Sequence, residues 1–172
     1  MDFTFRTYEH PDVRAMTAAV EEEYRELYGG DGDTAPVDVA DFEHPTGWFA
    51  VGYLDGKPVA MGGWRRHPPG AVPGERPGEI KRMYVVPEAR GRGLSRLMLR
   101  AIEDSARAAG VDWLVLETGL EQPAAVSLYR ATGYVDIPHF GYYADDHRAI
   151  HLGKDITKNA TEASPVSARK RA

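Results

Sequence analysis

The sequence contains no cysteine, which excludes disulfide bonds, thiolate metal ligands and a cysteine nucleophile. It has no apolar run near the roughly 18 residues that a membrane-spanning helix needs. Its first residues, Met1 to Thr4, show neither the basic nor the apolar segment of a secretion signal. These absences predict a cytoplasmic protein that does not contact a membrane, and they leave any catalysis to side chains other than thiols.

An excess of positive charge is also missing. The net charge of −5 argues against general binding of nucleic acid. The charge is nevertheless uneven, because residues 2–55 carry thirteen acids against three arginines, whereas residues 79–110 carry seven cations against four acids. The basic segment would suit an anionic ligand, while the acidic N-terminal third would suit a cationic substrate or serve solubility alone.

A chain of 172 residues with 42% hydrophobic content is long enough for one domain with a proper core. We expect an α/β domain over residues 1–155 and a polar, flexible tail over residues 156–172. The patterns predict strands at 3–6, 48–54, 57–64, 79–86 and 113–118, helices at 10–28, 94–109 and 122–133, a helical turn at 37–42, and loops at 29–36 and 66–78.

The most informative segment is a strand that begins at Glu79, enters a glycine-rich turn and opens a helix. Backbone N–H groups are unpaired at a helix N-terminus, and glycines let a phosphate approach them closely. The segment therefore predicts a pyrophosphate site. The apolar stripe of the following helix is expected at Leu94, Leu97, Met98, Ala101, Ile102, Ser105 and Ala109.

Three kinds of pyrophosphate site differ in their spacing. A P-loop needs a Lys-Ser or Lys-Thr pair after its second glycine, and Gly93 is followed by Leu94 and Ser95, so a nucleotide triphosphatase is disfavoured. A Rossmann turn needs a small residue where Arg96 stands, and an acid about 20 residues farther on, at the end of the next strand. Asp112 has this spacing but precedes its strand, whereas Glu117 lies at the end of a strand but comes rather late. A Rossmann-type oxidoreductase therefore stays open as the weaker alternative.

Two further patterns resemble those of the GCN5-related N-acetyltransferase (GNAT) family. Arg90-x-x-Gly93-x-Ser95 resembles the family signature Arg/Gln-x-x-Gly-x-Gly/Ala, with serine in the last position. A second pattern follows about thirty residues later: Gln122-x-x-Ala125-x-x-Leu128-Tyr129-x-x-x-Gly133-Tyr134. It resembles the family motif Asn-x-x-Ala-x-x-Leu/Phe-Tyr-x-x-x-Gly-Phe/Tyr, with glutamine in place of the usual asparagine. Two motifs in this order, each on a predicted strand-to-helix unit, are far more specific than one glycine turn.

The resemblance implies a single GNAT-like domain with a mixed, mostly antiparallel central sheet, flanking helices and splayed central strands. It implies acetyl-CoA as co-substrate and direct transfer of the acetyl group to a primary amine in a ternary complex. We expect a small-molecule amine as acceptor, or else a protein N-terminus or lysine, and we leave a homodimer open. Contacts with acetyl-CoA are expected from Met83, Tyr84, Val85, Arg90, Gly91, Arg92, Gly93, Leu94, Ser95, Arg96 and Gln122.

Acetyl transfer needs a neutral amine, and an alkylammonium has a pKa of about 10.4, so a base must remove a proton. The resemblance favours Glu79, although a salt bridge with Lys81 is an equally good interpretation of that residue. Glu117, His139 and Tyr142 are lesser candidates.

Tyr129 matches the tyrosine that, in the family, donates a proton to the departing thiolate, and a main-chain N–H near Met83 is expected to polarise the acetyl oxygen. No metal site is predicted. A catalytically silent acyl-CoA sensor remains a further alternative.

Overall fold

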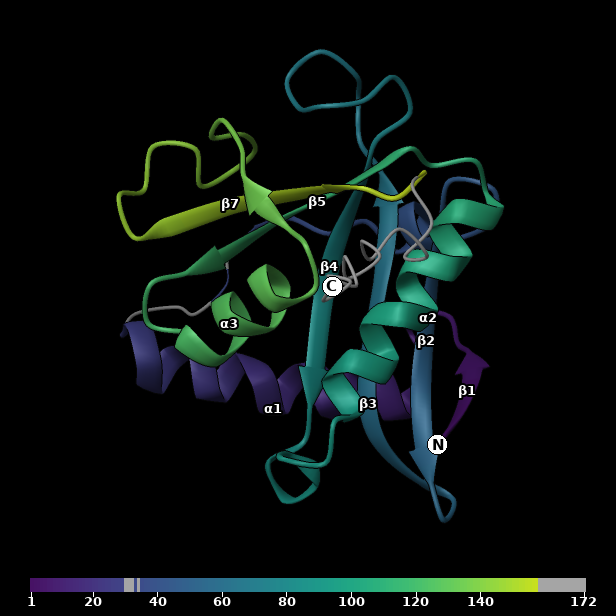
Figure 1. Ribbon diagram of the computed structural model, residues 1–172. Coiled ribbons are helices and arrows are strands. Elements are labelled where there is room, and N and C mark those ends of the chain that lie inside the picture. The colour runs from purple at the N-terminus through teal and green to yellow at the C-terminus, as the bar shows by residue number, and fades with distance from the viewer. Residues whose placement is uncertain (30–32, 34, 158–172) are drawn as a thin grey trace, which may run out of the picture.

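The computed structural model describes residues 1–29, 33 and 35–157 (Figure 1). Within these residues the chain forms one seven-stranded sheet, three α-helices and two short 3-10 helices. The strands are β1 (Asp2–Phe5), β2 (Gly47–Leu54), β3 (Lys57–Arg66), β4 (Gly78–Val85), β5 (Trp113–Gly119), β6 (Val135–Asp136) and β7 (Ala149–Asp155). The helices are α1 (Pro11–Tyr28), η1 (Val39–Phe42), η2 (Pro87–Ala89), α2 (Leu94–Ala108) and α3 (Pro123–Ala131).

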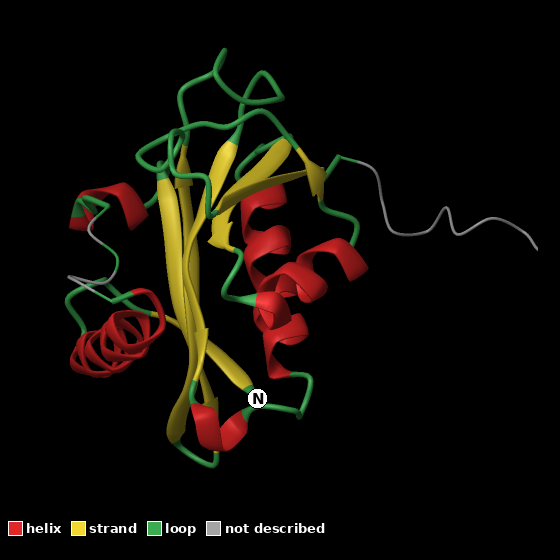
Figure 2. Cartoon of the chain, turned by 90° about the vertical axis from the view of Figure 1, so that its left-hand side faces the viewer, coloured by secondary structure: helices red, strands yellow, loops and turns green. Residues whose placement is uncertain are grey.

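The sheet has the order β1-β2-β3-β4-β5-β7-β6, and among the described strands every neighbouring pair is antiparallel except β4 with β5. Helix α1 covers one face, and α2 and α3 cover the other (Figure 2). The mixed, mostly antiparallel sheet predicted from the sequence is thus confirmed. The Rossmann alternative is wrong, because that fold requires a mostly parallel sheet.

Helix α1 begins and ends as its sequence predicts. The side chain of His10 accepts a hydrogen bond from the backbone N–H of Asp12, and Pro11 occupies the first helical turn. Gly29 ends the helix with a φ of 70°, a conformation that favours glycine. The buried face carries Val13, Met16 and Val20, which pack with Phe42, Phe49, Val51, Met61 and Tyr84 in one part of the core.

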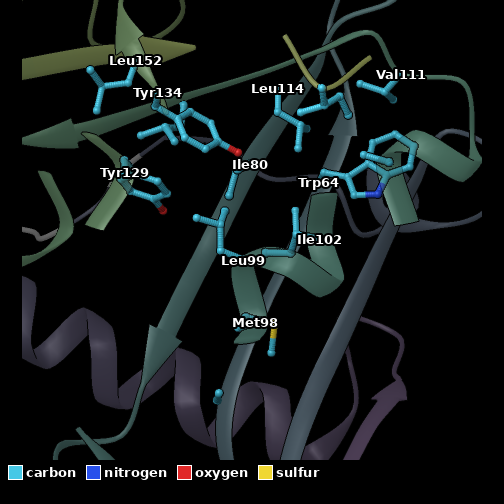
Figure 3. Close-up of a cluster of buried hydrophobic side chains, with 14 residues drawn as sticks. Trp64, Ile80, Met98, Leu99, Ile102, Val111, Leu114, Tyr129, Tyr134 and Leu152 are labelled. Atoms are coloured by element: carbon cyan, nitrogen blue, oxygen red, sulfur yellow. The ribbon is translucent and has the colours of Figure 1, made fainter. Parts of the chain in front are cut away.

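Helix α2 packs on β3 and β4 and forms the larger part of the core. Figure 3 shows Met98, Leu99 and Ile102 close to Ile80 and Leu114 of the sheet. The buried face differs from the predicted stripe, since Leu97 is 41% exposed whereas Leu99, Glu103 and Ala106 are buried. The helix is therefore rotated slightly from the expected orientation, so that the stripe is centred on Met98 and Ile102.

The two central strands separate after a short contact. Strand β4 pairs with β5 only at Gly78 with Leu114 and at Glu79 with Val115 (Figure 1). On its other side, β4 has an irregularity opposite Met61 to Gly63, where Arg82 has a φ of 56° and neither Arg82 nor Met83 has a register partner in β3. The splayed central strands implied by the resemblance are confirmed.

The C-terminal end of the described chain belongs to the core. Ile156 is fully buried, its N–H donates to the carbonyl of Asp112, and its carbonyl accepts from Nε of Arg107. Ile156 thus packs in the core although it was expected in the polar tail over residues 156–172, and residues 158–172 of that tail lie outside the described residues. Among the helices that the structure describes, none combines the length and the hydropathy needed to cross a bilayer.

Candidate active site

A cavity of about 220 Å³ lies where β4 and β5 separate. Its lining comes from both strands, from the C-terminal end of α1, from α3 and from the segment between β6 and β7. The lining residues are Tyr24, Tyr28, Gly29, Asp33, Ile80, Lys81, Arg82, Met83, Leu116, Glu117, Thr118, Gly119, Gln122, Ala125, Tyr129, Tyr143, Asp146, Arg148 and Ala149. A concave site at the end of a short strand contact, with several ionisable groups in its walls, is the expected form of a ligand pocket.

Tyr129 lies in the wall of this cavity, on α3. Its side chain is buried, and its Oη lies 3.8 Å from Sδ of Met83, a weak contact with a sulfur atom. Burial raises the pKa of the Tyr129 phenol above its ordinary value, and the neighbouring Tyr24 adds to this effect. Tyr129 is therefore a protonated donor at neutral pH.

Glu79 is buried but does not line the cavity. Its Oε2 lies 2.8 Å from Nε of Arg65, which stands directly opposite in β3, and its Oε1 lies 2.7 Å from Nζ of Lys81. Arg65 in turn lies 2.8 Å from Asp41. Both oxygens of Glu79 are thus committed to cations, and the structure contains the salt bridge with Lys81 that was the alternative interpretation.

Glu117 lines the cavity from β5. Its side chain is 7% exposed, and its Oε2 lies 3.5 Å from Nζ of Lys81. Its Oε1 makes no hydrogen bond with any described residue, and Gly141 packs so closely that a Cβ there would lie 2.6 Å from it. Burial raises the pKa of Glu117, the charge of Lys81 opposes this, and the charge of Glu79 adds to it.

Two histidines lie beyond Glu117. His151 stands opposite Glu117 in β7, with Nδ1 4.0 Å from Oε1, and burial lowers the pKa of its imidazole. The ring of His139 stacks on that of His151 with their centroids 4.4 Å apart. His139 and Tyr142, two of the lesser candidates, do not line the cavity, and Tyr142 is 60% exposed.

The glycine turn leads into α2 with unusual backbone angles. Gly91 and Gly93 have φ values of 73° and 75°, and Gly93 caps the helix. Arg92 and Arg96 are exposed, and neither forms an ion pair with an acid in the described part of the chain. Free cations beside a helix N-terminus would suit phosphate groups. Ser95 is partly exposed on the first turn of α2, whereas Leu94 is buried.

The side chain of Arg90 is directed elsewhere. Its Nη2 lies 2.7 and 2.9 Å from the carboxylate oxygens of Glu23 on α1, and its Nε donates to the carbonyl of Val85. Tyr84 also donates to Glu23, at 2.6 Å. Arg90 and Tyr84 therefore connect the turn and β4 to α1. Because their side chains are engaged in this way, we expect these two residues to contact a ligand through their main chain.

Gln122 directs its side chain towards α1, because its Nε2 donates to Oη of Tyr28 at 2.7 Å. The sequence did not single out several residues that complete the cavity: Tyr24, Tyr28, Asp33, Arg82, Asp146 and Arg148. No local pattern marks these residues, because their partners lie far away in the chain. The Oη of Tyr143, for example, donates to Asp33 across more than a hundred residues.

Comparisons with known proteins give the family and the fold. The sequence profile of the Acetyltransferase (GNAT) family matches residues 15–134. An IAA acetyltransferase from Azospirillum brasilense is 46% identical over 79 residues, which are 46% of this chain and 52% of that protein. A mycothiol acetyltransferase from Nocardiopsis dassonvillei is 34% identical over 99 residues, 56% of this chain and 30% of that one. The match with these two curated relatives thus spans about half or less of their length.

Solved structures show the same fold over most of the chain. A protein from Klebsiella pneumoniae, provisionally described as an acyl-CoA N-acyltransferase, superimposes with a TM-score of 0.73 at 26% identity and covers 90% of this chain and 97% of its own. An IAA acetyltransferase from Bacillus cereus gives a TM-score of 0.64 at 17% identity, over 90% of this chain and 98% of its own. At that identity the second comparison bears on the fold alone.

Proposed function

The chain belongs to the acetyltransferase (GNAT) family, and we propose that it transfers an acetyl group from acetyl-CoA to a primary amine by direct attack in a ternary complex. The observation that carries this proposal is the position of Glu117. It is a buried carboxylate with a raised pKa, and it lines the same cavity between two splayed strands as Tyr129 does. One wall can thus accept a proton, and the other can donate one.

The diphosphate of the co-substrate would lie on the turn from Arg90 to Arg96. The first backbone N–H groups of α2 and the free side chains of Arg92 and Arg96 support this placement. The left-handed Gly91 and Gly93 support it as well, because they leave the turn without side chains there. The pantetheine chain would then follow the main chain of Met83 to Val85 into the cavity, towards Tyr129.

The irregularity in β4 supports a role in polarising the thioester carbonyl. Arg82 and Met83 lack register partners in β3, and β5 has already separated from β4 at this level. A main-chain N–H at Met83 that points into the cavity would donate to the acetyl oxygen and stabilise the negative charge that develops there.

We assign the role of base to Glu117 rather than to Glu79. A base needs a lone pair that is available to the amine, and both oxygens of Glu79 lie against Arg65 and Lys81. In Glu117, Oε1 makes no hydrogen bond with the described residues, and the raised pKa makes the carboxylate a stronger base. The ammonium gives one proton to Glu117, and the neutral nitrogen forms the new bond to the carbonyl carbon. The carbon–sulfur bond then breaks, and the nitrogen loses its second proton to solvent.

The sulfur leaves as a thiolate and is stabilised by the phenol of Tyr129. That phenol lies in the cavity wall, and its contact with a described residue is a weak one, 3.8 Å from Sδ of Met83, so the hydroxyl is not held by a strong partner. Its raised pKa keeps it protonated, so it can donate to the departing thiolate and then recover its proton from solvent. A small amine fits the cavity best, while a protein amine would have to reach in from the surface.

The test combines a binding and a turnover measurement. Calorimetry should detect uptake of acetyl-CoA but not of NAD, and a panel of primary amines should release free thiol from acetyl-CoA. Uptake without thiol release from any amine would instead support a catalytically silent acyl-CoA sensor. No uptake of acetyl-CoA at all would refute both functions.

A further inference from the structure

The cations in the cavity wall are already matched by acids. Arg82 Nη1 lies 2.8 Å from Oδ2 of Asp33, and Arg148 Nη2 lies 3.1 Å from Oδ2 of Asp146. Lys81 lies between two carboxylates, with Nζ 2.7 Å from Glu79 and farther from Glu117. Each of these cations in the described lining therefore has a counter-ion, and a carboxylate or phosphate on a ligand would have to compete with that counter-ion.

One acid in the wall, Glu117, is matched less closely than Asp33 and Asp146. Asp41, Arg65, Glu79, Lys81 and Glu117 form a continuous row across η1, β3, β4 and β5. Three of them are carboxylates and two are cations, so the row carries one negative charge in excess. Glu117 is the end of this row that lines the cavity, and its nearest cation in the row, Lys81, lies 3.5 Å away. The ammonium group of a ligand would thus find a partner in Glu117.

Aromatic side chains form another part of the cavity wall. The rings of Tyr24 and Tyr28 lie edge to face with their centroids 6.0 Å apart, and Tyr143 faces the same cavity. The hydroxyl of Tyr28 accepts from Gln122, and that of Tyr143 donates to Asp33. With these hydroxyls engaged, the rings offer their apolar faces and edges, which favour another aromatic ring or an apolar chain.

We infer that the acceptor is a primary monoamine with an aromatic or otherwise apolar body and no carboxylate or phosphate. This inference rests on the proposed acetyltransferase function and specifies its substrate class. A carboxylate would be buried against cations that are already neutralised, and a second ammonium would find acids that are already paired. The amine itself would be held by Glu117.

The experiment compares amines that differ in one charge only. The ratio of kcat/KM should be measured for phenethylamine against phenylalanine, for tyramine against tyrosine, and for pentylamine against 1,4-diaminobutane. We expect each monoamine to be preferred by roughly 100-fold or more, since rejection depends on burying an unpaired charge. An equal or better rate with the amino acids, with the diamine or with a lysine peptide would overturn the inference.

One variant should change the preference in a defined direction. Arg82 Nε and Nη1 make no hydrogen bond with a described residue, although Nη1 lies 2.8 Å from Oδ2 of Asp33. Asp33→Asn would therefore leave a guanidinium that can bind a carboxylate. We expect the preference for phenethylamine over phenylalanine to fall at least ~10-fold in this variant. Glu22→Gln, at an exposed position on α1, is the matched control and should leave the ratio unchanged. An unchanged ratio in Asp33→Asn would count against the inference.

The outcomes separate this inference from the proposed function. If acetyl-CoA binds and another amine class is acetylated, the substrate class is wrong and the transferase stands. If acetyl-CoA binds but no amine reacts, both the substrate class and the transferase are wrong, and a sensor remains. If acetyl-CoA does not bind, the proposed function fails with everything that rests on it.

Discussion

The carboxylate of Glu79 and the ammonium of Lys81 form a buried ion pair, with Oε1 and Nζ 2.7 Å apart. Arg65 holds the other oxygen of Glu79 at 2.8 Å. A carboxylate held in this way stabilises the central strands and is poorly placed to receive a proton from a substrate. The ion pair also fixes Lys81 near Glu117, where its charge limits how far burial raises the pKa of that residue.

Replacing Glu79 should therefore affect stability more than chemistry. We expect Glu79→Gln to lower the free energy of unfolding by about 3 kcal/mol, because it removes one partner of a buried ion pair. Urea unfolding measures this change. The dependence of kcat/KM on pH should keep its acidic limb in the folded variant. A stable variant that loses this limb would identify Glu79 as the base.

Replacing Glu117 should remove the acidic limb itself. In the native protein kcat/KM should rise with pH through the raised pKa of Glu117, because only the carboxylate can accept the amine proton. In Glu117→Gln the rate should fall by about 100-fold or more, and the remaining rate should rise only as the free amine itself loses its proton. The pH profile of thiol release measures both effects. A native-like acidic limb in Glu117→Gln would contradict this assignment.

The same substitution should affect stability with a definite sign. The folded-state pKa of Glu117 is raised, so its stabilising contribution is complete below the ordinary glutamate pKa and is lost as the pH rises through the raised value. Glu117→Gln should then unfold at a higher temperature than the native protein at pH 8, with a smaller difference at pH 4. Lys81 keeps its partner Glu79 in this variant. Thermal unfolding at the two pH values is the check, and a destabilised variant at pH 8 would oppose it.

Tyr129 offers a variant that preserves shape. Tyr129→Phe removes one hydroxyl whose contact in the described structure is a weak one with the sulfur of Met83, so stability should change by less than about 1 kcal/mol. The value of kcat should fall by roughly 10 to 100-fold, since the departing thiolate loses its donor. The dissociation constant for acetyl-CoA should stay nearly constant. An unchanged kcat would mean that Tyr129 serves packing alone.

The arginines of the turn should separate into two kinds. Arg92→Ala and Arg96→Ala should weaken binding of acetyl-CoA, and each should reduce its dependence on salt, because both side chains are free to contact phosphates. Arg90→Ala should mainly loosen the link to α1, because Glu23 holds its guanidinium. Calorimetry at two salt concentrations distinguishes them. A loss of salt dependence in Arg90→Ala alone would reverse this assignment.

A side chain at Gly93 should strain the backbone of the turn. Its φ of 75° is left-handed, and nothing lies within 4 Å of the position that a Cβ would take, so the effect of Gly93→Ala is strain rather than a clash. We expect a loss of about 1–2 kcal/mol in stability, together with weaker binding of acetyl-CoA. Arg100→Ala, at an exposed position later in α2, is a control for any general effect on the helix.

Local features of this protein could be predicted from its sequence. Helix α1 starts at His10 and Pro11 and ends at Gly29, and the turn at Asp55 and Gly56 connects two strands, because caps and turns depend on adjacent residues. The two motifs around Gly93 and Tyr129 likewise lie within single strand-to-helix units. Their resemblance to one family was enough to predict the fold and the class of co-substrate.

The arrangement of charges could not be predicted in this way. Whether Glu79 or Glu117 faces the cavity depends on the registers of β3, β4, β5 and β7, and on the loop that brings Gly141 against Glu117. Local pattern thus determined the elements, the glycine turn and the family. Long-range pairing decided that Glu79 is neutralised by cations and that Oε1 of Glu117 receives no hydrogen bond from a described residue. The physical reason is that the electrostatics of a buried group depend on neighbours that are distant in the chain.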